Sequence, residues 1–148
     1  MHHSKTRFSN RVDNYVRYRP HYPDALVKTL EEQRVLQGGS IVADVGSGTG
    51  ISTELFLKKG YSCIGVEPNR DMRLAAEREL RAYPAFTSAE GSAEETGLEE
   101  NSVDLVIAGQ AFHWFDQQAS KLEFNRILKT GGHVALLWNK RNTEGSAF

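Results

Sequence analysis

A glycine-rich stretch, VADVGSGTG at residues 42–50, has the residue types that bring a ligand close to the main chain. Gly46, Gly48 and Gly50 carry no Cβ atom, so the chain can turn sharply there and a ligand can approach its backbone. Asp44 precedes these glycines, and an acid in this place suits a cationic group better than a pyrophosphate. The stretch therefore predicts a loop that holds a ligand carrying positive charge.

Two kinds of phosphate-binding loop fit this stretch poorly. A dinucleotide fingerprint, G-x-G-x-x-G, would need glycine where Ile51 stands, and the Gly-Lys-Ser/Thr ending of a Walker A loop is absent. A second acid, Glu67, ends the next apolar run in CIGVEPN. Its two carboxylate oxygens suit the paired hydroxyls of a ribose, in a nucleoside or in NAD alike. The loop and Glu67 together predict a ligand that contains a nucleoside.

The elements that must position these residues alternate between strands and helices. The expected strands span 40–45, 61–66, 85–89, 102–109 and 133–138, and the expected helices span 8–20, 23–33, 52–59, 69–83 and 116–129, the last capped by Asp116 and closed by Gly131 and Gly132. This alternation predicts a doubly wound α/β fold, in which helices cover both faces of a mostly parallel sheet. Ligands of such sheets bind beyond the carboxyl ends of the strands, where the strand order reverses.

Composition narrows the class of protein. The chain has 148 residues, 39% of them hydrophobic, which suits a single globular domain, and its net charge of −1 gives no attraction for nucleic acid or an anionic membrane. No apolar run approaches the roughly 18 residues that span a bilayer, and the first residues lack the apolar segment of a signal peptide. We therefore expect a cytoplasmic location without a membrane or nucleic-acid partner. The single cysteine, Cys63, excludes an internal disulfide and a cysteine-based zinc cluster, so no metal site is expected, and the thiol is expected to be buried.

The motif VADVGSGTG, together with the segments that follow the later strands, resembles the class I S-adenosylmethionine-dependent methyltransferases. In that family the acid and the glycine loop surround the amino-acid end of the cofactor, and the acid after the second strand accepts both ribose hydroxyls. The segment 90–98 resembles the part that reads adenine, with Ser92 where an aspartate is common, and 102–116 resembles the fourth strand and the loop leaving it. The resemblance implies S-adenosylmethionine as cofactor and S-adenosylhomocysteine as product. The cofactor-binding residues that it implies here are Asp44, Gly46, Ser47, Gly48, Glu67, Ser92, Ala93, Gln110 and Ala111.

The segment 7–23, RFSNRVDNYVRYRPHYP, is similar to the start of trans-aconitate methyltransferase-like proteins, in which an N-terminal helix lies over the cofactor. This similarity implies that Tyr15, Tyr18 and Arg19 lie near the cofactor, with the planar guanidinium of Arg19 pairing its carboxylate. It also implies a small-molecule methyl acceptor, with a carboxylic acid as one class. His113 is a candidate base or substrate-orienting residue, because it follows a strand that opens into the ligand crevice and titrates near neutrality; a structural hydrogen-bonding role is the alternative.

The resemblance also suggests how the chain is organised. We expect one S-adenosylmethionine-binding domain over 1–148, with a helical cap at 1–37 and an α/β core at 38–148 that lacks the last two strands of the family. The strand at 133–138 would then be an exposed apolar edge, open to self-association, and the chain would bind cofactor with weak or no turnover. Two other functions remain open: a non-catalytic nucleoside-binding domain and, less favoured because of Ile51, an NAD-dependent oxidoreductase.

Overall fold

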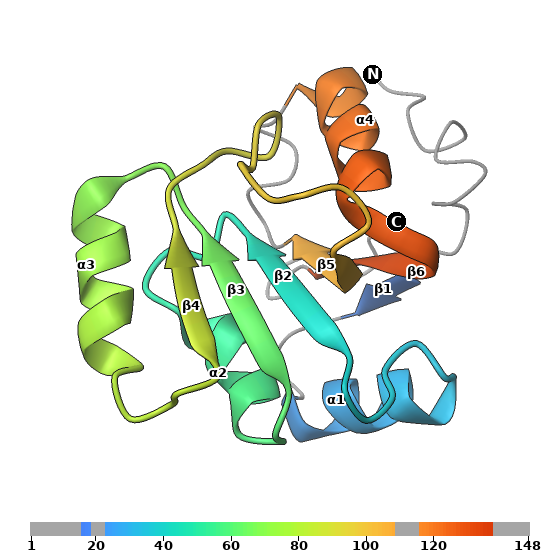
Figure 1. Cartoon of the computed structure of the whole chain (residues 1–148). Coiled ribbons are helices and arrows are strands. Elements are labelled where there is room, and N and C mark those ends of the chain that lie inside the picture. Colours follow the sequence, from blue (N-terminus) through green and yellow to red (C-terminus); the bar gives the residue numbers. More distant parts are fainter. Residues whose placement is uncertain (1–15, 19–22, 109–115, 138–148) are drawn as a thin grey trace, which may run out of the picture.

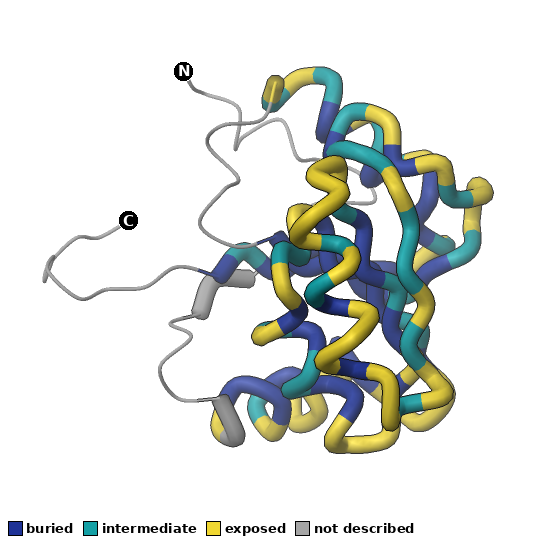
Figure 2. The backbone as a smooth tube through the Cα atoms, turned by 90° about the vertical axis from the view of Figure 1, so that its left-hand side faces the viewer, coloured by how far each residue is buried: buried dark blue, intermediate teal, exposed yellow. Residues whose placement is uncertain are grey.

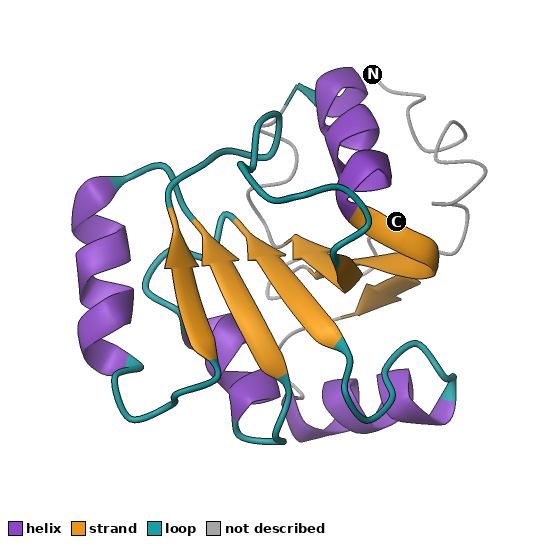
Figure 3. Cartoon of the chain, viewed as in Figure 1, coloured by secondary structure: helices purple, strands orange, loops and turns teal. Residues whose placement is uncertain are grey.

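A computed structural model describes residues 16–18, 23–108 and 116–137. Its strands are β1 (Val16–Tyr18), β2 (Ile41–Val45), β3 (Ser62–Val66), β4 (Phe86–Ala89), β5 (Val103–Ala108) and β6 (Leu128–Leu137), and its helices are α1 (Pro23–Glu32), α2 (Ile51–Leu57), α3 (Arg70–Glu79) and α4 (Gln117–Ile127). Figure 1 and Figure 3 show a twisted sheet in the middle of the molecule with helices packed around it. The doubly wound α/β fold predicted from the alternation is confirmed. None of the helices in this part of the chain has the length and apolar character that crossing a membrane requires.

The order of the strands places the ligand crevice. The six strands of the described residues form one sheet in the order β1-β6-β5-β2-β3-β4, and every neighbouring pair is parallel. The chain moves outward from β2 through β3 to β4 on one side, and from β5 to β6 on the other (Figure 1). The order therefore reverses between β2 and β5, and the carboxyl ends of these two strands border the crevice in which such sheets bind ligands. The glycine loop follows β2 directly.

Alternate residues of the central strands face two separate apolar clusters. Val42 and Ile107 belong to a cluster that includes residues of α1 and α2, whereas Ala43 and Val106 belong to one that includes Phe124 of α4. All five of these side chains are completely buried. The edge strand β4 and the helix α3 are more exposed, as Figure 2 shows on the side that faces the viewer. The sheet is thus anchored from both faces at β2 and β5, the two strands that border the crevice.

The first strand corrects two expectations. Residues 16–18 form β1, so the helix predicted over 8–20 is wrong at these positions. β1 pairs with the end of β6, with Val16 opposite Ala135 and Tyr18 opposite Leu137, and this non-local pairing outweighs the local helical pattern. The pairing also covers the outer edge of β6 at these positions. The expected exposed edge for self-association is therefore wrong there.

The junction of α4 and β6 differs from the predicted boundary. α4 ends at Ile127 and β6 begins at Leu128, so Gly131 and Gly132, expected to close the helix, lie inside the strand. Leu128 pairs with Val103 and His133 pairs with Leu105, so residues 129–132 of β6 stand opposite Asp104 alone. β6 therefore bulges at its start. Because the extended backbone of Leu128 (φ −78°, ψ 139°) begins the strand at once, the helix needs no glycine to end it.

Candidate functional site

The glycine loop is tied to the end of the neighbouring strand. The N–H groups of Gly46 and Ser47 donate to the carbonyl of Val66, at 2.8 and 3.2 Å. The N–H of Gly48 donates to Oε1 of Glu67 at 2.8 Å. The structure thus brings together the loop and the second acid, which the sequence analysis assigned to one ligand.

Asp44 lies at the end of β2, with 3% of its surface exposed. Its Oδ2 accepts a hydrogen bond from the Thr53 hydroxyl of α2 at 2.6 Å, and Thr53 is itself completely buried. Burial raises the pKa of the Asp44 carboxyl to about 6, although the Thr53 hydrogen bond opposes this, and the charge of Glu67 raises it further. None of the ion pairs within the described residues involves Asp44. A cationic group brought beside it would stabilise its charged form, so Asp44 fits a ligand with positive charge.

Glu67 is half-buried and held in one orientation. Its Oε1 accepts from Gly48 as described, and its Oε2 accepts from the N–H of Asn69 at 3.1 Å. Arg73 fixes the backbone at Glu67 by donating to the carbonyls of Glu67 and Pro68, both at 3.2 Å. Each carboxylate oxygen accepts one N–H and keeps capacity for a further donor. Glu67 can therefore accept two hydroxyl groups of a ligand, as a ribose diol requires.

Two residues that position the loop were missed from the sequence. Thr53 belongs to no motif, and its contact with Asp44 depends on how α2 packs on β2. Gly65 lies inside β3, where a Cβ atom would come within 2.9 Å of the Ser47 hydroxyl and 3.1 Å of the Phe86 ring. A glycine in the middle of a strand is a known sign of close approach by another segment, so Gly65 could have been found.

The segment expected to read adenine begins beside Glu67. The N–H of Glu67 donates to the carbonyl of Ala89 at 3.0 Å, where β4 ends. Ser92 then forms a turn, in which its hydroxyl accepts from the N–H of Glu95 at 3.1 Å. Ala93 is buried, with 2% of its surface exposed, and belongs to the cluster on the α4 face of the sheet. The segment is therefore anchored next to the ribose-binding acid, and the roles of Ser92 and Ala93 toward a base stay predictions.

The remaining predicted residues are not brought together by the described structure. Tyr15, Arg19, Gln110, Ala111 and His113 lie outside the described residues, and of Tyr18 only the backbone is described. Tyr18 ends β1, with β6 and β5 between it and β2. The roles given to these residues stay predictions.

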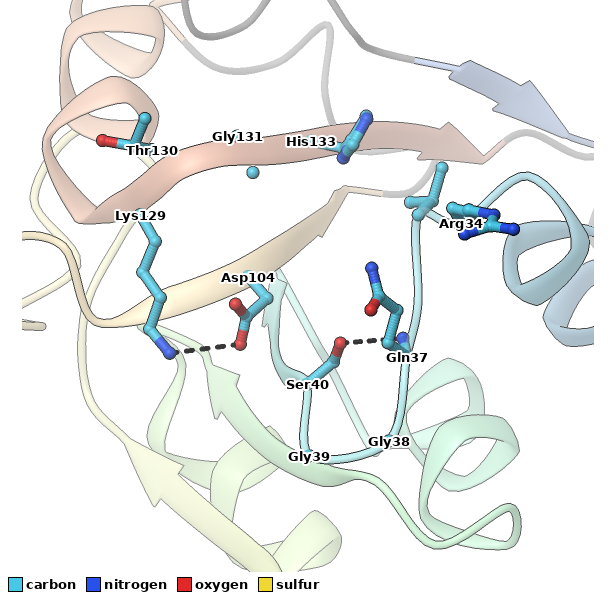
Figure 4. Close-up of a pocket in the computed structure, with 12 residues that line it drawn as sticks. Arg34, Gln37, Gly38, Gly39, Ser40, Asp104, Lys129, Thr130, Gly131 and His133 are labelled. Atoms are coloured by element: carbon cyan, nitrogen blue, oxygen red, sulfur yellow. Dashed lines mark hydrogen bonds and ion pairs between the residues drawn. The ribbon is translucent and has the colours of Figure 1, made fainter.

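A polar cavity of about 300 Å³ lies at the amino ends of the strands, near the starts of β2 and β5 (Figure 4). It is lined by Arg34, Val35, Gln37, Gly38, Gly39, Ser40, Asp104, Lys129, Thr130, Gly131, Gly132 and His133. Asp104 Oδ2 accepts from the N–H of Ile41 at 2.8 Å and lies 3.4 Å from Lys129 Nζ. These contacts join the first residue of β2 to β5 and to the bulge of β6. The cavity is therefore separate from the crevice beside the glycine loop.

Replacing Asp104 by alanine is expected to lower the free energy of unfolding by about 1–3 kcal/mol, because the N–H of Ile41 loses its acceptor. Asp104→Asn keeps an acceptor oxygen and should cost less than half as much, since the exposed pair with Lys129 contributes little. Urea unfolding of the two variants and the wild-type chain measures both costs. Equal losses in the two variants would show that the charge of Asp104, rather than the hydrogen bond, matters.

Comparison with known proteins gives a consistent result. The family model described as "Methyltransferase domain" matches residues 43–136. An uncharacterized methyltransferase of Mycobacterium bovis is 34% identical over 135 residues, which cover 91% of this chain and 53% of that protein. A Saccharomyces cerevisiae protein described as "Probable S-adenosylmethionine-dependent methyltransferase" is 30% identical over 127 residues, with 82% of this chain and 43% of that protein covered. The chain spans about half the length of the curated relatives it matches.

Solved structures share the same fold. The YcgJ protein of Bacillus subtilis superposes with a TM-score of 0.70 at 27% identity, covering 78% of this chain and 50% of that one. A SAM-dependent methyltransferase from Aquifex aeolicus gives a TM-score of 0.71 at 19% identity, covering 85% of this chain and 68% of that one. The identity of the second pair is low, so that likeness concerns the fold alone.

Proposed function

Because the chain belongs to the S-adenosylmethionine-dependent methyltransferase family, we propose that the crevice at the carboxyl ends of β5, β2, β3 and β4 binds S-adenosylmethionine for methyl transfer to a small-molecule acceptor. The observation that carries this proposal is the buried carboxyl group of Asp44, which has no ion-pair partner among the described residues and lies beside a glycine loop that is bonded to Glu67. The family match does not favour an NAD-dependent oxidoreductase or a non-catalytic nucleoside-binding domain.

Each half of the cofactor has a matching group in the described site. Asp44 favours the cationic amino-acid end of the cofactor, since a positive charge relieves the cost of a buried carboxylate. Glu67 favours the ribose, since its two fixed oxygens match two neighbouring hydroxyls. Ser92 and Ala93 are the residues proposed to contact the adenine ring. Together these residues favour a ligand in which a nucleoside carries an amino acid.

When bound, S-adenosylmethionine supplies an activated methyl group, so the protein has to hold the acceptor in line and exclude water. A carboxylate acceptor needs no general base, whereas an enol or carbon nucleophile would need one, and His113 is the candidate for that role. The similarity of 7–23 to trans-aconitate methyltransferase-like proteins supports a small carboxylic acid as acceptor, and it supports Tyr15, Tyr18 and Arg19 as residues near the cofactor, with Arg19 pairing its carboxylate. The weak turnover expected of the 148-residue chain stays a prediction, which a methyl-transfer assay measures.

Two ligands separate the roles of the two acids. S-adenosylhomocysteine carries both the ribose and the amino acid, whereas 5′-methylthioadenosine lacks the amino acid. Glu67→Ala is expected to weaken binding of both ligands at least tenfold, because each loses charge-assisted hydrogen bonds from its ribose. Asp44→Asn should weaken S-adenosylhomocysteine alone. Isothermal titration calorimetry measures both effects.

The exposed Glu79 provides the control, because it is the last residue of α3, at the end of that helix farther from Glu67, and Glu79→Ala should leave both affinities unchanged. Binding of NAD in preference to S-adenosylhomocysteine by the wild-type chain would overturn the proposed function. Equal losses of both ligands in Asp44→Asn would contradict the role given to Asp44.

A further inference from the structure

A hydrogen-bonded network joins the segment 92–98 to the middle of α4. The N–H and the hydroxyl of Thr96 both donate to Oε2 of Glu123, at 2.9 and 2.7 Å. The hydroxyl oxygen of Thr96 also accepts from the N–H of Leu98 at 3.1 Å. Thr96 is completely buried, so these polar groups have no ready exchange with water. Glu123 thus fixes the backbone of the segment at Thr96.

Arg126 completes the network from the next turn of α4. Its Nε and one terminal nitrogen donate to the two oxygens of Glu123, at 2.9 and 2.8 Å. The same terminal nitrogen donates to the carbonyl of Leu98 at 2.6 Å. The hydrogen bonds from Arg126 are the main reason that the pKa of Glu123 lies at about 2, so its charge persists at every working pH. The pair therefore holds the segment at two points, Thr96 and Leu98.

A second attachment lies at the start of α4. Glu94 Oε2 accepts from the N–H of Asp116 at 2.7 Å. The Asp116 side chain in turn caps α4 by accepting from the N–H groups of Gln118 and Ala119. Between 92 and 98 the backbone forms no helix or strand, and the N–H of Thr96 and the carbonyl of Leu98 bond to side chains of α4. Ser92 and Ala93 immediately precede these attachments. Ala93 also packs in the apolar cluster on the sheet, and the hydrogen bonds to α4 hold the segment that follows it.

We propose that Thr96, Glu123 and Arg126 are positioning residues that set where Ser92 and Ala93 meet the base and thereby determine the preference for adenine. The inference rests on the proposed function, which gives Ser92 and Ala93 to the adenine ring. Recognition of a base edge depends on hydrogen bonds, which weaken steeply when donor, hydrogen and acceptor are misaligned. A segment released from α4 loses the contact with the exocyclic amine of adenine, while the contacts of Asp44 and Glu67 stay. The network thus governs base selectivity separately from nucleoside affinity.

Thr96→Val and Thr96→Ser form a matched pair for the test. Valine has the shape of threonine without the hydroxyl, so Glu123 and the N–H of Leu98 each lose a partner, whereas serine keeps the hydroxyl. The probes are S-adenosylhomocysteine and S-inosylhomocysteine, in which a carbonyl replaces the exocyclic amine, and calorimetry measures the ratio of their affinities. The wild-type chain is expected to prefer adenine at least tenfold, since a site that bonds an amine rejects an analogue without it. Thr96→Val should reduce the ratio to about threefold or less, and Thr96→Ser should keep it.

A control and a second variant keep the test decisive. Tyr83→Phe removes a partly buried hydrogen bond of 3.0 Å to Glu54, on the face of the sheet opposite α4, and should leave the ratio unchanged. If Thr96→Val does not fold, Glu123→Gln tests the same network and should lower the ratio at least threefold.

The outcomes separate the two proposals. Failure of the wild-type chain to bind S-adenosylhomocysteine overturns the proposed function and this inference with it. Binding with no preference between the two bases, or an equal loss of both in Thr96→Val and Glu123→Gln, overturns this inference alone. In that case the network only stabilises the fold.

Discussion

Replacing Asp44 by asparagine is expected to flatten the dependence of stability on pH between about pH 4 and pH 6. The folded protein raises the pKa of Asp44 from 3.8 to about 6, chiefly by burial, so the native state binds this proton more tightly than the unfolded state. The contribution of Asp44 is therefore fully present below pH 4 and is lost as the pH rises through 6. A difference of this size corresponds to a loss on the order of 3 kcal/mol. Asparagine stays neutral, and its oxygen can still accept from Thr53.

Urea unfolding of the wild-type and Asp44→Asn chains from pH 4 to pH 8 measures this effect. Glu67 is the charged group that faces Asp44 and raises its pKa, so Glu67→Gln should reduce the slope in part. Identical slopes for Asp44→Asn and the wild-type chain would refute the account. The result matters for function, because a carboxylate that destabilises the empty protein is one that a bound cation can stabilise.

Replacing Gly50 by alanine is expected to lower the free energy of unfolding by about 2–5 kcal/mol. Gly50 caps α2 with φ at +93°, which strains any residue with a side chain, at a cost of about 1–3 kcal/mol. The new Cβ atom would also lie 2.7 Å from Cδ1 of Leu80, a side chain only 2% exposed, so the packed core must shift. Thermal unfolding should show a midpoint lower by roughly 5–15 °C.

Gly60 offers a matched control. It has the same φ of +93°, but a Cβ atom there would meet nothing within 4 Å. Gly60→Ala should therefore show the cost of the backbone strain alone, about 1–3 kcal/mol, the same as for the backbone at Gly50. Equal losses in the two variants would mean that Leu80 moves aside without cost, and the packing argument for Gly50 would be wrong.

Much of the fold and part of the site follow from local sequence patterns. The apolar runs of β2 and β5 identify strands buried on both faces, and Asp116 caps α4 as predicted. Cys63 is 1% exposed, as expected for a small side chain inside a strand, and burial raises the pKa of its thiol to about 12. The contact between the glycine loop and Glu67 was predictable because parallel strands end at the same edge of a sheet.

The features that escaped prediction depend on partners distant in sequence. The strand β1 has a helical pattern locally and is a strand only because β6 pairs with it. Gly131 and Gly132 have the composition of a helix end, but the bulge opposite Asp104 uses them inside a strand. Thr96 and Glu123 lie far apart in the chain, and no local sequence motif predicts their hydrogen bond. Tertiary contact outweighs local preference at each of these places.

The pairing of β1 with β6 also limits the order in which the strands can join the sheet during folding. The first strand of the described chain needs the last one as its neighbour, so the segment 16–18 has no sheet to join until a ribosome has delivered residues 135–137. The strands from β2 to β5 can assemble earlier, because each pairs with a strand nearer in sequence or already made. Non-local pairings form more slowly than local ones, so among the described strands we expect β1 to dock after β2 to β5 have paired. Until β1 docks, the outer edge of β6 at residues 135–137 lacks the partner that it has in the described structure.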